Sequence, residues 1–214
     1  MHTVSGNISK NDKLIIDIQY FGSITYHKIL FQFSNIEFEL YETYQKMSFR
    51  NRCRVAGSNG VVNLSVPLEK GRDQKILTKD ARISYATRWQ TEHWRTIESC
   101  YSRAPFFEFY RDQVEGLIRG QEVFLFDKNI AIMDWLKRVL KFLGKIGMTG
   151  QYEKQYPSET TDLRNSLLPK NTPPNSVPRY VQVFEDRIGF QPDLSVLDLL
   201  FCCGPESSSI LSRE

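Results

Sequence analysis

An early strand and helix constrain the fold of this chain more than any other feature. Leu14-Ile15-Ile16-Asp17-Ile18 is almost entirely apolar, which is typical of a buried strand, and Gly22-Ser23 ends it. Ser23 is a good N-cap for a helix that continues to Phe33. Residues 35–41 then alternate apolar and polar side chains, as a half-buried strand does. This first βα unit favours an α/β architecture.

A hairpin and a series of helices follow. Residues 48–55 and 61–68 predict two strands joined by the turn Ser58-Asn59-Gly60, because Asn-Gly is a strong hairpin signal. The further expected elements are strands at 76–84 and 180–184 and helices at 91–101, 105–117, 127–143 and 193–201. The sequence therefore predicts a single α/β domain over 1–206, with a mixed β-sheet flanked by helices. An α+β arrangement with the helices segregated on one face is the alternative.

Two segments are expected to lack regular structure. Residues 157–179 hold five of the nine prolines and show almost no periodicity, which is typical of a linker, a lid or a binding loop. Residues 207–214 begin with three serines and are expected to form a flexible C-terminal tail.

Composition and motifs limit the possible functions. A net charge of only +3 argues against a protein that coats nucleic acid, and no stretch approaches the roughly 18 to 20 apolar residues of a membrane span. The four cysteines at 53, 100, 202 and 203 lack zinc-site spacing and are expected to be reduced thiols, which favours the cytoplasm. Three histidines make a metal centre improbable, and no nucleotide- or flavin-binding motif predicts a cofactor. The oligomeric state is left open.

The run Ser48-Phe-Arg-Asn-Arg-Cys-Arg-Val55 gives the first indication of a site. If it is a strand, Arg50, Arg52 and Arg54 share one face, each about 6.6 Å from the next at ~3.3 Å per residue. No acidic residue lies between Lys46 and Arg54. Such a row suits phosphate or carboxylate oxygens, because each guanidinium can bind an anion bidentately. A solvated strand face that keeps the edge soluble is the alternative.

His93 is the candidate general base, because imidazole titrates near neutral pH. It lies in an expected helix with Trp89 and Cys100 on the same side. An interior histidine satisfied by a backbone carbonyl is the competing interpretation. Cys100 is a weaker candidate, since no activating base can be named for a nucleophilic thiol.

Charged residues of the late loops complete the candidate set. Asp162, Arg164 and Lys170 could close over an anionic ligand, or they could be solvated charges on a flexible connection. Glu185 could serve in acid–base chemistry, recognise an ammonium group, or pair with an arginine.

The order of several short motifs resembles the WbqC-like protein family across residues 14–206. The motifs are Ser48-Phe-Arg-Asn-Arg-Cys53, Asn59-Gly60, Leu64-Ser-Val-Pro67, the pattern from Trp89 through His93-Trp94, Ile97 and Tyr101 to Phe107, Asp162-Leu-Arg164, Pro169-Lys170, Val183-Phe-Glu185, Gly189-Phe190, Leu194 to Leu200, and Gly204-Pro205-Glu206. Residues that coincide with the family pattern are Arg50, Asn51, Arg52, His93, Tyr101, Asp162, Arg164, Lys170 and Glu185.

The resemblance implies a bacterial protein of surface-polysaccharide or O-antigen biosynthesis that transfers an acyl or aminoacyl group to a nucleotide-linked amino sugar. Many relatives carry a His-Gln-Pro segment after the first strand, whereas this chain reads Ile16-Asp17-Ile18-Gln19. Transfer would then depend on His93 or Asp17.

Three functions remain open at this stage. In the leading hypothesis Arg50, Arg52, Arg164 and Lys170 hold a pyrophosphate, with Asn51, Tyr101 and Asp162 also in contact with the substrate. His93 deprotonates an attacking sugar amine or hydroxyl, and Glu185 orients it. A non-catalytic module that binds an anionic ligand or a partner protein is the second. Single-stranded nucleic acid stacked on Tyr44 and Phe49 is the least favoured.

Overall fold

The computed structural model describes residues 13–69, 76–169 and 177–213. Its first elements are β1 (Lys13–Ile16), α1 (Ile24–Leu30) and β2 (Asn35–Phe38). Ser23 caps α1 as predicted, because its hydroxyl oxygen accepts a hydrogen bond from the backbone N–H of Tyr26 at 3.2 Å. The helix ends at Leu30, a few residues before the expected Phe33.

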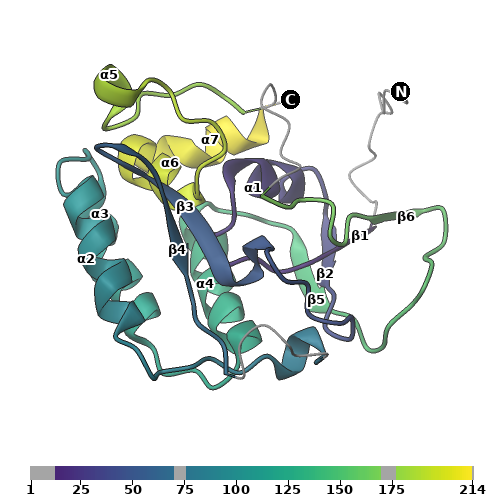
Figure 1. The fold of residues 1–214 in the computed structure, drawn as a ribbon. Coiled ribbons are helices and arrows are strands. Elements are labelled where there is room, and N and C mark those ends of the chain that lie inside the picture. Colours follow the sequence, from purple (N-terminus) through teal and green to yellow (C-terminus); the bar gives the residue numbers. More distant parts are fainter. Residues whose placement is uncertain (1–12, 70–75, 170–176, 214) are drawn as a thin grey trace.

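Four parallel strands form the main sheet, in the order β5 (Lys145–Met148), β2, β1, β6 (Thr160–Asp162). Leu14 of β1 lies opposite Ile36 on one side and Thr161 on the other. The chain passes from β1 to β2 and β5 on one side, and only then to β6 on the other side (Figure 1). The strand order therefore reverses between β1 and β6. In open parallel sheets, the carboxyl ends at such a reversal form the crevice in which ligands bind.

An antiparallel hairpin stands apart from this sheet. It consists of β3 (Arg52–Gly57) and β4 (Gly60–Ser65), with Arg52 opposite Ser65. Gly60 adopts a φ of 129° at the predicted Asn-Gly turn, a conformation that L side chains rarely tolerate. The α/β class, with parallel and antiparallel pairing and flanking helices, is confirmed. The two kinds of pairing occupy separate sheets.

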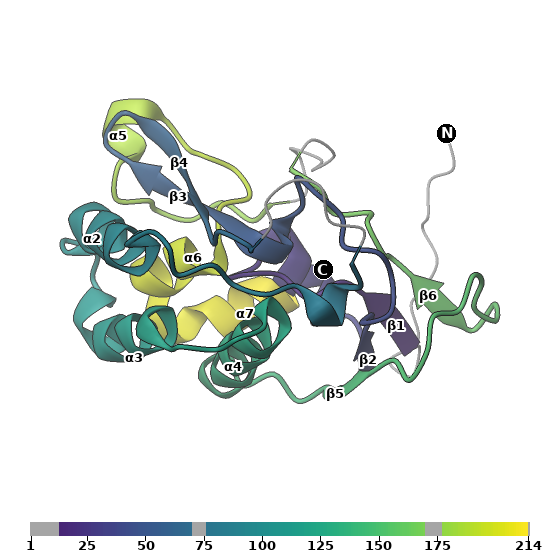
Figure 2. The same ribbon diagram turned by 60° about the horizontal axis from the view of Figure 1, so that its bottom comes forward.

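The helices gather mainly on one side of the molecule, beside the hairpin, and the four-stranded sheet lies on the other (Figure 2). The longer ones are α2 (Trp89–Tyr101), α3 (Phe107–Arg119), α4 (Leu125–Val139) and α6 (Val196–Cys203). The shorter ones are α5 (Glu185–Ile188), α7 (Ser207–Ser212) and the 3-10 turns η1 (Phe49–Asn51), η3 (Thr78–Asp80) and η4 (Gly204–Glu206). No helix among these described residues is long and apolar enough to span a membrane.

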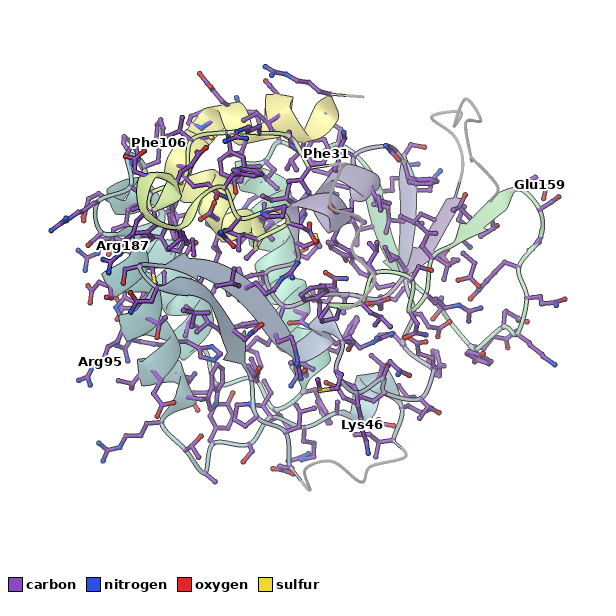
Figure 3. The ribbon with its side chains drawn as sticks, turned by 45° about the horizontal axis from the view of Figure 1, so that its top comes forward. Phe31, Lys46, Arg95, Phe106, Glu159 and Arg187 are labelled. Atoms are coloured by element: carbon purple, nitrogen blue, oxygen red, sulfur yellow. The ribbon has the colours of Figure 1, made fainter. Side chains whose placement is uncertain are left out.

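Two apolar cores hold the elements together. The larger core contains fully buried Val55 of the hairpin, Ile97 of α2 and Leu200 of α6. The smaller core packs the sheet against α1 and α4 and includes Leu14 and Leu30. Because Val55 belongs to the larger core, the hairpin is anchored by its apolar face, which leaves Arg52 and Arg54 on the opposite face. Figure 3 shows Glu159 at the far edge beside β6, away from the helices.

The expected strand over 48–51 is wrong. The hydroxyl oxygen of Ser48 accepts a hydrogen bond from the Arg50 backbone N–H at 3.4 Å, and its O–H donates to the Gln45 carbonyl at 2.7 Å. These local bonds favour a turn over an extended chain. Residues 49–51 accordingly form η1, and the strand begins only at Arg52.

Two other expected strands are also wrong. Residues 76–84 contain η3, where the Thr78 backbone N–H donates to the Glu42 carbonyl at 2.9 Å. Residues 180–184 form a loop, because the Gln182 side chain accepts a hydrogen bond from the Gln191 backbone N–H at 2.8 Å and donates one to the Gln191 carbonyl at 2.9 Å. A side chain that satisfies the backbone in this way replaces the strand partner that the segment would otherwise need.

The C-terminal residues 207–212 form α7, contrary to the expected loose tail. Leu211 is only 1% exposed and joins the larger core, while the Ser207 hydroxyl donates to the Leu199 carbonyl at 3.2 Å. Burial of apolar side chains thus orders a segment that its serines alone do not favour. The proline-rich segment likewise contributes β6, and its residues 170–176 lie outside the described residues.

Candidate functional site

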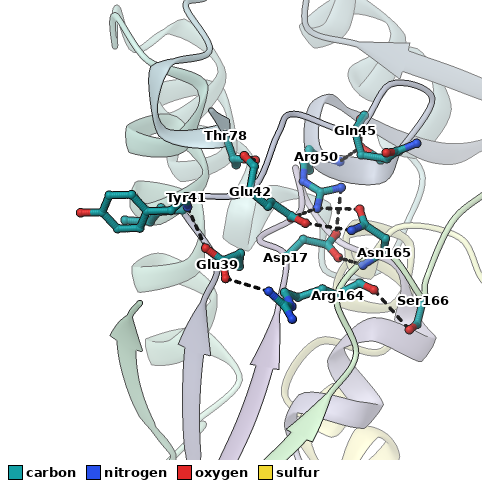
Figure 4. A network of polar contacts seen from close by, with 12 residues as sticks. Asp17, Glu39, Tyr41, Glu42, Gln45, Arg50, Thr78, Arg164, Asn165 and Ser166 are labelled. Carbon is teal, nitrogen blue, oxygen red and sulfur yellow. Dashed lines mark hydrogen bonds and ion pairs between the residues drawn. The ribbon is translucent and has the colours of Figure 1, made fainter. Parts of the chain in front are cut away.

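The carboxyl ends of the parallel strands place polar side chains next to one another (Figure 4). Asp17 directly follows β1, Glu39 follows β2, and Arg164-Asn165 follow β6. The Asn165 backbone N–H donates to Asp17 Oδ1 at 3.0 Å, which joins the two strands on either side of the reversal point. We call this group, together with Glu42, Arg50 and Asp162, the carboxyl-end cluster.

Arg50 lies at the centre of the carboxyl-end cluster and is fully buried. Its Nη2 contacts Glu42 and donates to Asn165 Oδ1 at 3.0 Å, and its Nη1 lies 3.7 Å from Asp17 Oδ2. Asn129 holds the backbone, because its Nδ2 donates to the Arg50 carbonyl at 2.8 Å. The guanidinium therefore already pairs with the carboxylates of Asp17 and Glu42.

Arg164 is also paired within the cluster. Its Nη2 lies 2.6 Å from Asp162 Oδ2, and its Nη1 lies 3.3 Å from Glu39 Oε2. The rings of Tyr152 and Tyr156 lie 5.1 and 4.9 Å from the guanidinium carbon. Partial burial opposes ionisation of Asp162, but the hydrogen bonds from Arg164 outweigh it and lower the pKa of this carboxyl.

The cluster is not a site of positive charge. It holds two more carboxylates than guanidiniums, since within the described residues Asp17, Glu39, Glu42 and Asp162 face only Arg50 and Arg164. Burial raises the pKa of Glu42, although Arg50 and Asn165 act in the opposite direction. Glu42 also borders an open pocket of about 340 Å³ with Tyr41, Thr43 and Tyr152. A pyrophosphate would not be attracted to this cluster as a whole.

Arg52 has different surroundings, in a pocket at the base of the hairpin that we call the Arg52 pocket. It has a volume of about 780 Å³, and it is lined by Tyr44, Lys46, Met47, Asn51, Arg52, Ser65, Val66, Pro67 and Leu68. Arg52 Nη2 lies 3.6 Å from Met47 Sδ, and in the described part of the chain Arg52 makes no ion pair. Asn51 Nδ2 donates to the Val66 carbonyl at 2.8 Å.

Tyr44 connects the Arg52 pocket to the carboxyl-end cluster. Burial raises the pKa of its hydroxyl to about 12, and Arg50 and Arg52 both act to lower it. The phenol therefore lies within the field of both guanidiniums.

Arg54 is the third arginine of the predicted row, but it does not share a site with Arg50 or Arg52. Its Nη2 donates to the Asp193 carbonyl at 2.9 Å and pairs with Asp193 Oδ2 at 3.3 Å. Its guanidinium also covers the ring of Phe49, which is 2% exposed and thus unavailable for base stacking. The predicted row of three free guanidiniums is wrong, since Arg50 and Arg54 are neutralised and η1 turns Arg50 inward.

His93 lies in the interior, as the competing interpretation proposed. It is 4% exposed, its Nδ1 lies 3.1 Å from the Tyr20 hydroxyl, and the Trp89 ring packs edge-on at 5.0 Å. Burial lowers the pKa of the imidazole to about 4, although the Ser65 backbone acts to raise it. The ring is therefore neutral at pH 7, and it belongs to the core between α2 and the hairpin.

The other predicted residues contact separate parts of the fold. The Tyr101 hydroxyl is buried, donates to Asp198 Oδ1 at 2.7 Å and accepts from the Ala56 backbone N–H at 3.0 Å. Glu185 pairs with Arg179 at 2.7 Å. Lys170 lies outside the described residues. The structure therefore unites Arg50, Asp162 and Arg164, and it places Asn51 and Arg52 together in the adjoining pocket.

Sequence reasoning missed Glu39, Glu42 and Asn165. A half-buried strand over 35–41 would turn Glu39 towards solvent, yet its side chain is fully buried. A usable signal was present, because a polar residue directly after a buried parallel strand lies at the edge where ligands bind.

Comparison with known proteins gives a family but no activity. A model of the WbqC-like protein family matches residues 19–168. The chain is 26% identical over 210 residues, 82% of this chain and 87% of the other, to a Mycobacterium tuberculosis protein named Uncharacterized protein Rv1507c. No solved structure matches.

Proposed function

The chain belongs to the WbqC-like protein family, and from this premise we propose that it is a cytoplasmic transferase acting on a nucleotide-linked amino sugar in bacterial surface-polysaccharide biosynthesis. In the reaction the sugar amine attacks the carbonyl carbon of an activated acyl or aminoacyl donor. An N–C bond forms, the bond to the donor's leaving group breaks, and the amine proton passes to a base.

One observation carries the binding part of this proposal: Arg52 has no carboxylate partner in the described residues and borders the Arg52 pocket. Its Nε is buried without a hydrogen bond there, so a donor is left over in a place where water is restricted. Such a donor is costly to leave unsatisfied, and the guanidinium that carries it suits a phosphate oxygen. The sequence predicted that four cations hold the pyrophosphate. Arg50 and Arg164 already pair with carboxylates, so we no longer assign these two to the phosphate.

The shape and lining of the Arg52 pocket suit the rest of such a ligand. A volume of about 780 Å³ lies in the range of small-molecule sites. Tyr44, Met47, Pro67 and Leu68 offer aromatic and apolar surface for a base or a sugar face, and Asn51 adds a polar group. We assign the phosphate to Arg52 and the polar contact to Asn51.

Isothermal titration calorimetry with a panel of nucleotide sugars tests this assignment. Arg52→Ala should weaken binding by about tenfold to a hundredfold, because a charge-assisted hydrogen bond is lost. Arg52→Lys should recover only part of it, since an ammonium cannot bind bidentately. Arg119→Ala, at an exposed pair with Glu115, is the matched control. Unchanged affinity in Arg52→Ala would remove the proposal.

A non-catalytic binding module is the second candidate, and the burial of His93 favours it. A base that is enclosed by Tyr20 and Trp89 has no access to a ligand in the Arg52 pocket unless the fold opens. The roles of His93 and Glu185 in catalysis stay predictions. Saturable binding of a nucleotide sugar without product formation from any acyl or aminoacyl donor would select the binding module; His93→Gln losing turnover but not binding would select the transferase.

A further inference from the structure

A second pocket lies at the opposite end of the hairpin from Arg52, and none of the residues assigned above takes part in it. Its volume is about 490 Å³. It is lined by the hairpin residues Gly57 to Val62, by Ser99 and Cys100 of α2 and Arg103 just beyond the end of that helix, and by Phe184 and Arg187 beside and within α5. Three segments distant in the sequence thus meet at this hairpin-tip pocket.

The charge of the hairpin-tip pocket has one sign. Among the residues that the structure describes, Arg103 and Arg187 are the only charged ones in the lining, and none of the lining residues is a carboxylate. In the described part of the chain neither arginine makes an ion pair, whereas Arg82, Arg111, Arg119 and Arg179 each do. Two guanidiniums without counter-charge raise the potential of a shared recess, which concentrates anions there.

The hairpin turn positions one of the two cations. Arg187 Nη2 donates to Asn59 Oδ1 at 3.1 Å, which leaves its remaining N–H groups for another acceptor. Ser58 and Ser99 add hydroxyl donors to the lining, and Phe184 and Val62 add apolar surface. Figure 3 shows Arg187 beside the tip of the hairpin. Guanidinium groups, hydroxyl groups and apolar side chains together suit a phosphate attached to a small organic group.

We propose that the hairpin-tip pocket is a second anion-binding site, which takes the phosphate group of a phosphorylated small molecule between Arg103 and Arg187. The site is independent of the Arg52 pocket. Gly57 lies five residues beyond Arg52 along β3, about 17 Å at ~3.3 Å per residue, so one phosphate cannot contact both. The recess is too small for a folded partner, and its size matches a ligand of metabolite dimensions.

Inorganic pyrophosphate is the probe, added to the ¹⁵N-labelled full chain at low ionic strength. The backbone amides of Gly57, Asn59 and Gly60 report on the tip alone and should shift saturably. Arg103→Ala/Arg187→Ala should weaken binding at these amides by about tenfold to a hundredfold, because charge-assisted hydrogen bonds are lost. Both side chains are exposed, so the fold should persist, which thermal unfolding checks.

Two control variants separate this site from other charges. Arg95→Ala removes an exposed arginine of α2 that does not line the pocket, and it should leave the titration unchanged. Arg52→Ala should also leave the tip amides unchanged, so the test of the hairpin-tip pocket is independent of the test of the Arg52 pocket. Equal shifts in the double variant, or no saturable shift in the unaltered chain at millimolar pyrophosphate, would overturn the inference.

Discussion

Replacement of Arg50 by methionine should destabilise the protein severely. The Arg50 side chain is 0% exposed, and its partners Asp17 and Glu42 are 0% and 7% exposed. Methionine keeps an unbranched chain of similar reach, so the change removes the charge more than the volume. It leaves two buried carboxylates without their cation, and it deprives Asn165 Oδ1 of a donor at 3.0 Å.

Loss of one partner of a buried ion pair costs about 3 to 5 kcal/mol of unfolding free energy. For a domain of this length, that corresponds to a fall in Tm of roughly 6 to 20 °C. The loss should shrink as the pH falls. Without the guanidinium, burial raises the pKa of Glu42 further, so the folded state binds a proton that the unfolded state has released above about pH 4.3.

Urea unfolding followed by circular dichroism at pH 7 and pH 5 measures these effects. Arg119→Ala, which removes an exposed i,i+4 pair with Glu115, should cost only about 0.3 to 0.5 kcal/mol. Adding Asp17→Asn and Glu42→Gln to Arg50→Met should recover much of the loss, since the orphaned charges disappear. A cost below about 1 kcal/mol, which is typical of an ordinary surface change, would refute the view of Arg50 as a buried structural cation.

The remaining predictions concern pH and the C-terminus. The pKa of His93 falls to about 4 in the folded protein, so stability should decrease as the pH falls from about 6.5 towards 4, because the unfolded state binds the proton first. His93→Gln should flatten this slope in urea titrations, and an unchanged slope would contradict the assignment. Leu211→Ala should lower the unfolding free energy by about 2 to 5 kcal/mol, since Leu211 is 1% exposed. Exposed Ser209→Ala is its control; equal melting temperatures would mean that α7 does not pack on the core.

Local signals in the sequence predicted the elements that depend on neighbouring residues. The apolar run at β1, the Ser23 cap and the Asn59-Gly60 turn each act over a few positions, and each appears in the structure. The strand expected at residues 180–184 failed for a reason of the same scale. Gln182 bonds to Gln191 and replaces the strand partner, and no rule of apolar alternation anticipates a side chain acting in this way.

The sequence by itself determined that this chain is an α/β protein with a hairpin and an arginine-rich segment that leads into its first strand. Only the tertiary structure decided which arginines keep their charge available. Arg50 pairs with Asp17 at the end of β1, and Arg54 pairs with Asp193 from 139 positions away, while Arg52 meets no carboxylate in the described residues. A guanidinium binds a ligand only where the fold has not already neutralised it. That depends on which distant strand ends come together, and the composition of one segment cannot specify it.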